Sequence, residues 1–334
     1  MAMEVAWIRG DGIGPEVTEA AIEVIAATGA SVAFVEVPAG EKAYQEYGTA
    51  IPDKLLEEIR RVKVCLKGPL RNPIGGGYGS PNHFLRRELN LFASVRPNVS
   101  YPGIPTPFSD VDITVLMHNM EGPDAGIDRY LGANREVVEH IGVMTRDATK
   151  RMLHFAFQYA LDRGKALAIP HFADQMKCYE GSWLRLAEEV GQDYPDVEFR
   201  GFLADNLAAQ LVTRPQRFSL IAGHHMWGDL FSGLCAGLVG GGSLATTINC
   251  GDEGVALFET GHGVGDDLAG KDAANPTASI VAGRYLLEEL GFSQEASRID
   301  CALREVFSNG EHLTADLGGC ASLSEFTTAV KQRL

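Results

Sequence analysis

Residues 5–68 decide the fold: VAWIRGDGIGPEVTEAAIEVIAATGASVAFVEVPAGEKAYQEYGTAIPDKLLEEIRRVKVCLKG. Short apolar runs (VAWI, VAFVEV and VCLKG) are separated by the amphipathic segments PEVTEAAIEVIAAT and DKLLEEIRRV. Short apolar runs are typical of strands and the amphipathic segments of helices, and strands joined through helices pair in parallel. The alternation therefore predicts an α/β fold with a largely parallel sheet.

The rest of the chain continues this pattern. Strands are expected within residues 110–121 and 166–172, and helices at 146–164, 180–192, 277–292 and 322–334. Residues 101–110, YPGIPTPFSD, are rich in proline and glycine, so the chain is expected to cross between two domains there. A length of 334 residues also favours one large or two closely joined domains.

Composition excludes several classes of protein. With 44 acidic and 29 basic side chains the net charge is -15, which argues against nucleic acids and anionic membranes as partners. The six cysteines form no CxxC pair, so neither a zinc knuckle nor a disulfide framework is indicated. There is no signal-peptide layout and no long apolar run, so we expect a soluble, cytoplasmic protein.

Residues 67–97, KGPLRNPIGGGYGSPNHFLRRELNLFASVRP, predict an anion-binding surface. Glycines at 75–77 and 79 let the backbone approach a ligand, and short polar side chains follow. Arg86, Arg87 and Arg96 come next, and a guanidinium donates two parallel hydrogen bonds to one carboxylate. The stretch is therefore suited to a di- or tricarboxylic acid. The alternative is that these arginines are only solvated charges on a helix face.

Residues 10–16, GDGIGPE, form a predicted turn whose glycine spacing differs from the dinucleotide fingerprint of the standard Rossmann fold. Four further motifs follow the 67–97 stretch: DNLAAQLVTRP (205–215), GDLFSGLCAGLVGG (228–241), ETGHGVGDDLAGKDAANP (259–276) and DLGG (316–319). Together and in this order they resemble the β-decarboxylating dehydrogenases, which act on isocitrate, isopropylmalate or homoisocitrate.

The resemblance implies an isopropylmalate-dehydrogenase-like fold of two discontinuous α/β domains with a central cleft. Residues 1–99 plus 250–334 would form the larger, cofactor-side domain. Residues 100–249 would form the smaller one, with the metal-site and dimer-interface segments. It also implies a homodimer that oxidises a 2-hydroxy acid with NAD or NADP and holds Mg or Mn as a Lewis acid.

Site residues are implied position by position. Ser80, Asn82, Arg86 and Arg96 match substrate-binding positions, and Asp205 and Asp229 match metal ligands, Asp205 completing the neighbouring subunit's site. The positions that match the cofactor site are Ile13, His262, Gly263, Asp267 and Asn275. A carboxylate at Asp267 would repel a 2′-phosphate, which favours NAD over NADP. Alternatively, Asp266 and Asp267 only cap the following turn.

Four functional positions depart from the family pattern. Met117 replaces an arginine, Asp124 the catalytic tyrosine, Phe172 the catalytic lysine, and Gly233 a metal-binding carboxylate. A phenyl ring can neither relay a proton nor donate to a hydroxyl. Losing a carboxylate weakens a site for a hard cation.

These departures leave the chemistry open. Asp124 and Asp174 would face a cationic or hydrogen-bond-donating group of an altered substrate, and His225 is a further candidate for proton transfer. Other histidines near the gaps are His118, His171 and His224. Three functions remain: an NAD-dependent 2-hydroxy-acid oxidoreductase with altered substrate and decarboxylation, a catalytically silent binding or regulatory member, and a non-redox metal-dependent decarboxylase or lyase.

Overall fold

A computed structural model describes residues 2–73 and 77–334, with the backbone alone for residues 123–125. Glycines 75 and 76 of the predicted turn thus lie outside the described residues. The chain forms two compact units: residues 1–91, 99–109 and 236–334 make unit 1, and residues 92–98 and 110–235 make unit 2. Each unit is described by itself.

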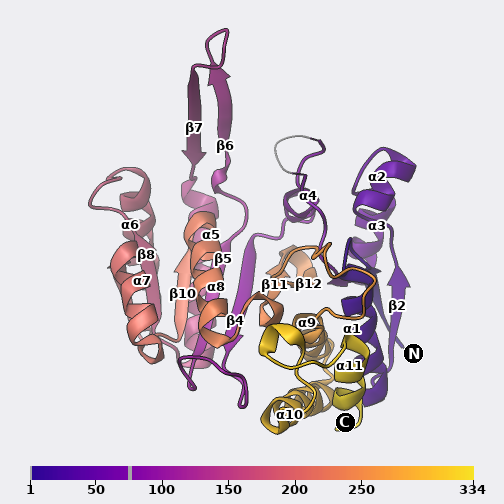
Figure 1. Ribbon diagram of the computed structural model, residues 1–334. Coiled ribbons are helices and arrows are strands. Elements are labelled where there is room, and N and C mark those ends of the chain that lie inside the picture. Colours follow the sequence, from indigo (N-terminus) through magenta and orange to yellow (C-terminus); the bar gives the residue numbers. More distant parts are fainter. Residues whose placement is uncertain (1, 74–76) are drawn as a thin grey trace. The chain divides into compact units, whose positions relative to one another are not determined.

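Unit 1 contains a mostly parallel sheet in the order β2-β1-β3-β12-β11 (Figure 1). Strand β1 pairs in parallel with β2 and β3, β12 pairs in parallel with β3, and β11 is antiparallel to β12. The strands are β1 (Met3–Ile8), β2 (Val32–Glu36), β3 (Val64–Lys67), β11 (Thr246–Cys250) and β12 (Ala256–Thr260).

Helices cover both faces of this sheet because its buried strands alternate apolar side chains between the faces. Val5, Leu66 and Phe258 pack in one core with α1 (Gly14–Thr28), α9 (Thr277–Glu289), α10 (Ser293–Asn309) and α11 (Leu323–Lys331). Ile8, Cys65 and Leu257 lie in the other core. Helices α3 (Asp53–Val62) and α4 (Pro81–Glu88) contribute to it, and α2 (Glu41–Tyr47) lies between β2 and α3 in the sequence.

Unit 2 contains strands in the order β4-β5-β10-β8-β9, in which β5, β10, β8 and β9 are parallel. Its strands are β4 (Ala93–Val99), β5 (Asp112–His118), β8 (Leu167–His171), β9 (Phe199–Leu203) and β10 (Leu220–Gly223). Its helices are α5 (Arg146–Arg163), α6 (Tyr179–Gly191), α7 (Ala204–Thr213) and α8 (His225–Val239), the last of which continues into unit 1. Short 3-10 turns occur at Pro215–Arg217, Gly242–Leu244, Asp252–Gly254 and Ala315–Leu317.

Strands β6 (Gly122–Leu131) and β7 (Val137–Val143) form a separate antiparallel ribbon (Figure 1). The pairing of Ile127 with Ile141 and of Leu131 with Val137 places these side chains on one face of the ribbon. All four are more than a third exposed. Nothing in our interpretation of the sequence anticipated this ribbon.

The predicted α/β class is confirmed, and the segments expected as helices and strands are found within a few residues. Helix α5, for example, ends at Gly164, which adopts the left-handed conformation expected of a helix stop. Among the described residues, no helix is both long and apolar enough to span a membrane.

Candidate functional site

The candidate substrate and cofactor residues of unit 1 gather at one edge of its sheet. The loops after β1, β3 and β12 leave the carboxyl ends of parallel strands, which lie at the same edge. The 10–16 and 262–265 loops are in contact, because the Ile13 N–H donates to the Val264 carbonyl at 2.8 Å. A Cβ on Gly12, which has φ +58°, would lie 2.0 Å from that carbonyl oxygen, so only glycine fits there.

Helix α4 carries three of the predicted substrate-binding residues. The Ser80 hydroxyl caps the helix by accepting a hydrogen bond from the His83 N–H at 3.2 Å. Asn82 and Arg86, four residues apart, share one face of α4. Oδ1 of Asn82 is buried and has no hydrogen-bond partner among the described residues. A ligand donor is one explanation of such an atom.

A buried ion pair lies behind Arg86. Lys67 and Glu259 are paired on adjacent strands, β3 and β12, and their side chains are 2% and 9% exposed. Glu259 also accepts from Asn249 at 2.7 Å and lies 3.8 Å from the Arg86 guanidinium. Burial alone would raise the pKa of Glu259, but the charges of Lys67 and Arg86 outweigh it and lower that pKa. The ionised carboxylate thus holds Arg86 from the protein side.

The predicted cofactor residues also lie in unit 1. Nδ1 of His262 is 2.9 Å from the Gly263 carbonyl, and its buried Nε2 has no partner among the described residues. Burial lowers the pKa of His262, so the ring is neutral near pH 7. A neutral imidazole with one open nitrogen in a glycine-containing loop suits the adenosine half of a dinucleotide.

The two acids after this loop differ in their surroundings. Both are exposed, but Asp266 binds Arg71 through two hydrogen bonds, which lower the pKa of its carboxyl group. Asn275 is committed internally: its Oδ1 accepts from the Thr277 N–H and hydroxyl, and its Nδ2 donates to Asp316 at 3.0 Å. The Asn275 side chain therefore helps to start α9.

Unit 2 gathers its own residues at the carboxyl edge of its parallel strands. His118 ends β5, Phe172 follows β8, and His224 follows β10. Arg96, on β4, forms an ion pair with Asp229 of α8 at 2.8 Å, and its side chain is only 14% exposed. The fourth substrate-binding candidate therefore contacts one of the two predicted metal ligands.

A buried cluster surrounds the position of Phe172. The carboxylate of Glu180, fully buried, lies 2.8 Å from Nε2 of His224 and accepts from Trp227 at 3.0 Å and from the Phe172 N–H at 3.1 Å. The Phe172 ring packs edge-on against Trp227 with centroids 5.0 Å apart. We call Phe172, Glu180, His224 and Trp227 the aromatic cluster.

Comparison with known proteins decides the family. Residues 4–330 match the family described as isocitrate/isopropylmalate dehydrogenase. The chain belongs to this family. The isopropylmalate-dehydrogenase-like fold expected from the motifs is thereby confirmed, since the crystal structure of isocitrate dehydrogenase from Methylococcus capsulatus superposes with a TM-score of 0.96 at 40% identity, covering 100% of this chain and 99% of that one.

Curated relatives within the family carry two kinds of name. The NAD isocitrate dehydrogenase catalytic subunit 5 of Arabidopsis thaliana is 39% identical, over 97% of this chain and 87% of that protein. An NAD isocitrate dehydrogenase protein of Dictyostelium discoideum that is named as regulatory is 37% identical, over 99% and 92%. Both are named as mitochondrial, so the expectation of a cytoplasmic protein is wrong. Free cysteines and a missing leader pattern do not identify a compartment.

The described part of this chain lacks a complete site for the divalent metal of the family. No group of three or more His, Cys, Asp or Glu side chains there could hold an ion. Asp229 lies in α8, and Gly233, one turn later, has no carboxylate; Asp205 lies in α7, on another element.

The remaining candidates differ in their placement. Asp124 lies in β6, but its side chain is outside the described residues. Asp174 is exposed in the turn after Phe172, and His225 begins α8 next to Gly122. His118 has both nitrogens engaged, with the Glu121 N–H and the Ala148 carbonyl, and burial lowers its pKa. His118 is therefore a structural histidine.

Our sequence interpretation missed several residues that build the site. Lys67 and Glu259 were not singled out, although each is a lone charge near the end of an apolar strand, a detectable sign of a buried pair. Asp11, whose carboxylate accepts from the backbone N–H groups of Glu41 and Arg71, lies inside the GDGIGPE motif and was also missed. Glu180 and Trp227 gave no such sign.

Proposed function

We propose that this protein is an NAD-dependent oxidoreductase acting on a 2-hydroxy acid whose structure differs from that of isocitrate. The proposal rests on two of the buried, unpartnered atoms in the described part of unit 1, Oδ1 of Asn82 and Nε2 of His262, because both belong to residues predicted to bind substrate or cofactor. Buried polar atoms in native proteins nearly always have partners, so both positions are suited to ligands. NAD would supply the hydride acceptor.

The retained residues define which part of the acid is recognised. Arg86, held from behind by Glu259, and Arg96, at the Asp229 carboxylate, suit one or two carboxylates. The exposed carboxylate of Asp267 favours NAD over NADP because it would repel a 2′-phosphate.

Phe172 of the aromatic cluster and Met117 are the reasons for proposing an altered substrate. The Phe172 side chain has no hydrogen-bond donor, and Met117 has no guanidinium. Met117 packs closely against Gly228, because a Cβ added to Gly228 would lie within 2.5 Å of Cβ and Cγ of Met117. A substrate carboxylate at this position would therefore receive neither a hydrogen bond nor a positive charge from these two side chains. The carboxylate of Asp174 instead favours a cationic or hydrogen-bond-donating group on the substrate, and so does that of Asp124, which is placed here from its sequence position alone.

The test is NADH formation with a panel of malate-type acids, with and without Mn²⁺, including acids that carry an amine or amide in place of the third carboxylate. Turnover that falls at least tenfold in Arg96→Ala supports the proposal. Carbon dioxide release without NADH would instead identify a decarboxylase or lyase.

A second function is favoured by the same cluster. A fully buried, hydrogen-bonded carboxylate under an aromatic pair is a packed structure rather than an open proton-transfer site. One relative of similar identity is named as regulatory. NAD binding without turnover of any acid, together with a change in the activity of a catalytically complete relative on mixing, would establish a silent family member.

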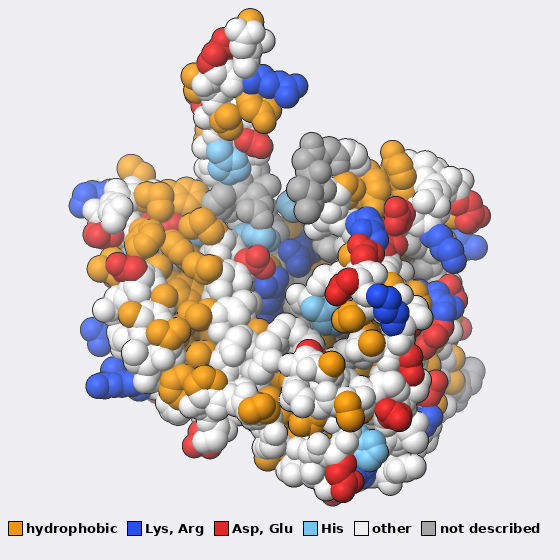
Figure 2. All heavy atoms as spheres, in the orientation of Figure 1, with side chains coloured by type: hydrophobic (Ala, Val, Ile, Leu, Met, Phe, Trp, Pro, Cys, Tyr) orange, Lys and Arg blue, Asp and Glu red, His pale blue; other side chains and the backbone are white. Residues whose placement is uncertain are grey.

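Assembly with a second protomer, most simply an identical one, is part of the proposal. The β6–β7 ribbon exposes apolar side chains, which Figure 2 shows along its length, and Leu230 of α8 and Val212 of α7 are also about half exposed. Exposed apolar surface of this extent is typical of an interface. Asp205 would then serve the neighbouring protomer's site.

A further inference from the structure

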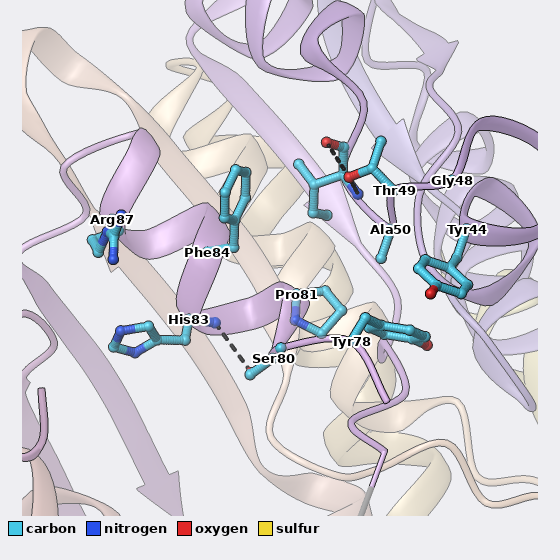
Figure 3. A pocket seen from close by; sticks show the side chains of 12 residues that line it. Tyr44, Gly48, Thr49, Ala50, Tyr78, Ser80, Pro81, His83, Phe84 and Arg87 are labelled. Atoms are coloured by element: carbon cyan, nitrogen blue, oxygen red, sulfur yellow. Dashed lines mark hydrogen bonds between the residues drawn. The ribbon is translucent and has the colours of Figure 1, made fainter. Parts of the chain in front are cut away.

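Unit 1 contains a pocket that is lined by Ser80 but by none of the other residues assigned to the proposed reaction. Its volume is about 280 Å³, and it lies between α2, the 48–51 turn and α4 (Figure 3). Ligand pockets typically measure about 300–1,000 Å³, and this one lies at the lower end of that range. It therefore suits a molecule with one or two rings and is too small for a dinucleotide. Its lining residues include Tyr44, Ala50, Tyr78, Pro81, Phe84 and Arg87.

Aromatic rings make up much of the wall. The rings of Tyr44 and Tyr78 lie 4.6 Å apart, and Phe84 and Pro81 of α4 line the same pocket (Figure 3). Tyr44 is 42% and Phe84 40% exposed, although both have large apolar surfaces. A planar ring placed among them would remove this surface from water and make stacked or edge-on contacts.

A cation lies at one side of the pocket. In Figure 3, Arg87 is on the side away from the two tyrosines. Its side chain is 65% exposed, and among the described residues the carboxylate it approaches is that of its neighbour Glu88, at 3.9 Å. The guanidinium can therefore donate to a ligand carboxylate without breaking a close ion pair.

We propose that this pocket binds a small aromatic carboxylate, with the ring among Tyr44, Tyr78 and Phe84 and the carboxylate on Arg87. The site is separate from that of the hydroxy acid, because Asn82 and Arg86 point from a different face of α4. It shares with that site the helix and its cap, Ser80. Occupancy of the pocket therefore stabilises α4 and the residues on its other face.

The experiment measures binding by calorimetry and ligand-observed NMR, with indole-3-acetate and benzoate as probes. Benzamide, which has a ring but no charge, and cyclohexanecarboxylate, which has a charge but no aromatic ring, are the comparison ligands. We expect the two aromatic acids to bind at least tenfold more tightly than either comparison ligand. No binding at millimolar concentration, or equal binding of benzamide, would overturn the proposal.

Two variants test the geometry. Arg87→Gln should weaken the binding of both acids about tenfold, and Phe84→Ser should abolish it; both side chains are well exposed, so folding should survive. Lys331→Gln on α11, on the other core of unit 1, is the matched charge control and should leave binding unchanged. Binding that survives both pocket variants would contradict this site. Binding that persists in Arg96→Ala distinguishes it from the hydroxy-acid site.

Discussion

At the scale of single residues, the site is held by groups whose roles depend on their neighbours rather than on their type. Glu259 is the clearest case, because a carboxylate at an apolar strand end is stable there only with Lys67, Arg86 and Asn249 around it. The sequence shows that these residues exist, but not that β3 and β12 place two of them side by side. Non-local pairing is what sequence patterns predict least well.

Glu259→Gln should destabilise the protein by about 3–5 kcal/mol at pH 7, because it leaves the buried Lys67 charge without its partner. Urea unfolding measures this. Glu253→Gln, which removes the exposed partner of Lys63, is the matched control and should change stability little. Equal effects of the two substitutions would contradict a buried pair.

The same pair predicts a pH dependence. The pKa of Glu259 is lower in the folded protein than its unfolded value of about 4.3. Its contribution is therefore complete above that value and is lost as the pH falls through the depressed pKa. Urea midpoints measured from pH 7 down to pH 3 should fall more steeply in the parent protein than in Glu259→Gln. Parallel curves would refute the assignment.

Gly233→Asp should strengthen Mn²⁺ binding about tenfold. A Cβ at Gly233 meets nothing within 4 Å, and position 233 shares a helix face with Asp229 one turn earlier. Gly237→Asp, one turn further along and equally open, is the control and should have no effect. Calorimetric titration with Mn²⁺ measures both, and identical affinities would argue against a cation site at Asp229.

At the scale of elements, the sequence predicted most of the helices and strands because apolar periodicity and stop signals are local. The β6–β7 ribbon was not predicted, because its residues alternate weakly and its fold depends on register. The aromatic cluster was not predicted either, since Phe172, Glu180 and Trp227 meet only after β8 and β10 pair. The family resemblance predicted only that Phe172 replaces a lysine.

Helix α4 depends on its cap. Ser80→Ala should lower stability by about 1 kcal/mol, because it removes the acceptor for the His83 N–H. Ser80→Thr retains a hydroxyl acceptor and should cost less. Thermal unfolding of unliganded protein measures the difference. An alanine variant as stable as the parent would show that the Ser80 cap does not contribute to stability.

At the scale of the whole molecule, the exposed face of the β6–β7 ribbon predicts association. Ile141→Ser should weaken a dimer at least tenfold, because Ile141 lies with Ile127, Leu131 and Val137 on one face of the ribbon. His140→Ser changes the opposite face of the same strand and should leave assembly intact. Sedimentation velocity at several concentrations measures both; a dimer unaffected by Ile141→Ser would place the interface elsewhere.

The Lys67–Glu259 pair has a consequence for how such a protein can evolve. Either residue alone is a liability once the other is replaced, so the route from this pair to an uncharged one passes through an intermediate that is less stable than both ends. We therefore expect strong epistasis between positions 67 and 259. In a library randomised at both positions, survivors should be paired charges or paired neutral residues. Many survivors with a charge at only one of the two positions would contradict this expectation, because they would show that the core tolerates an unpaired buried charge.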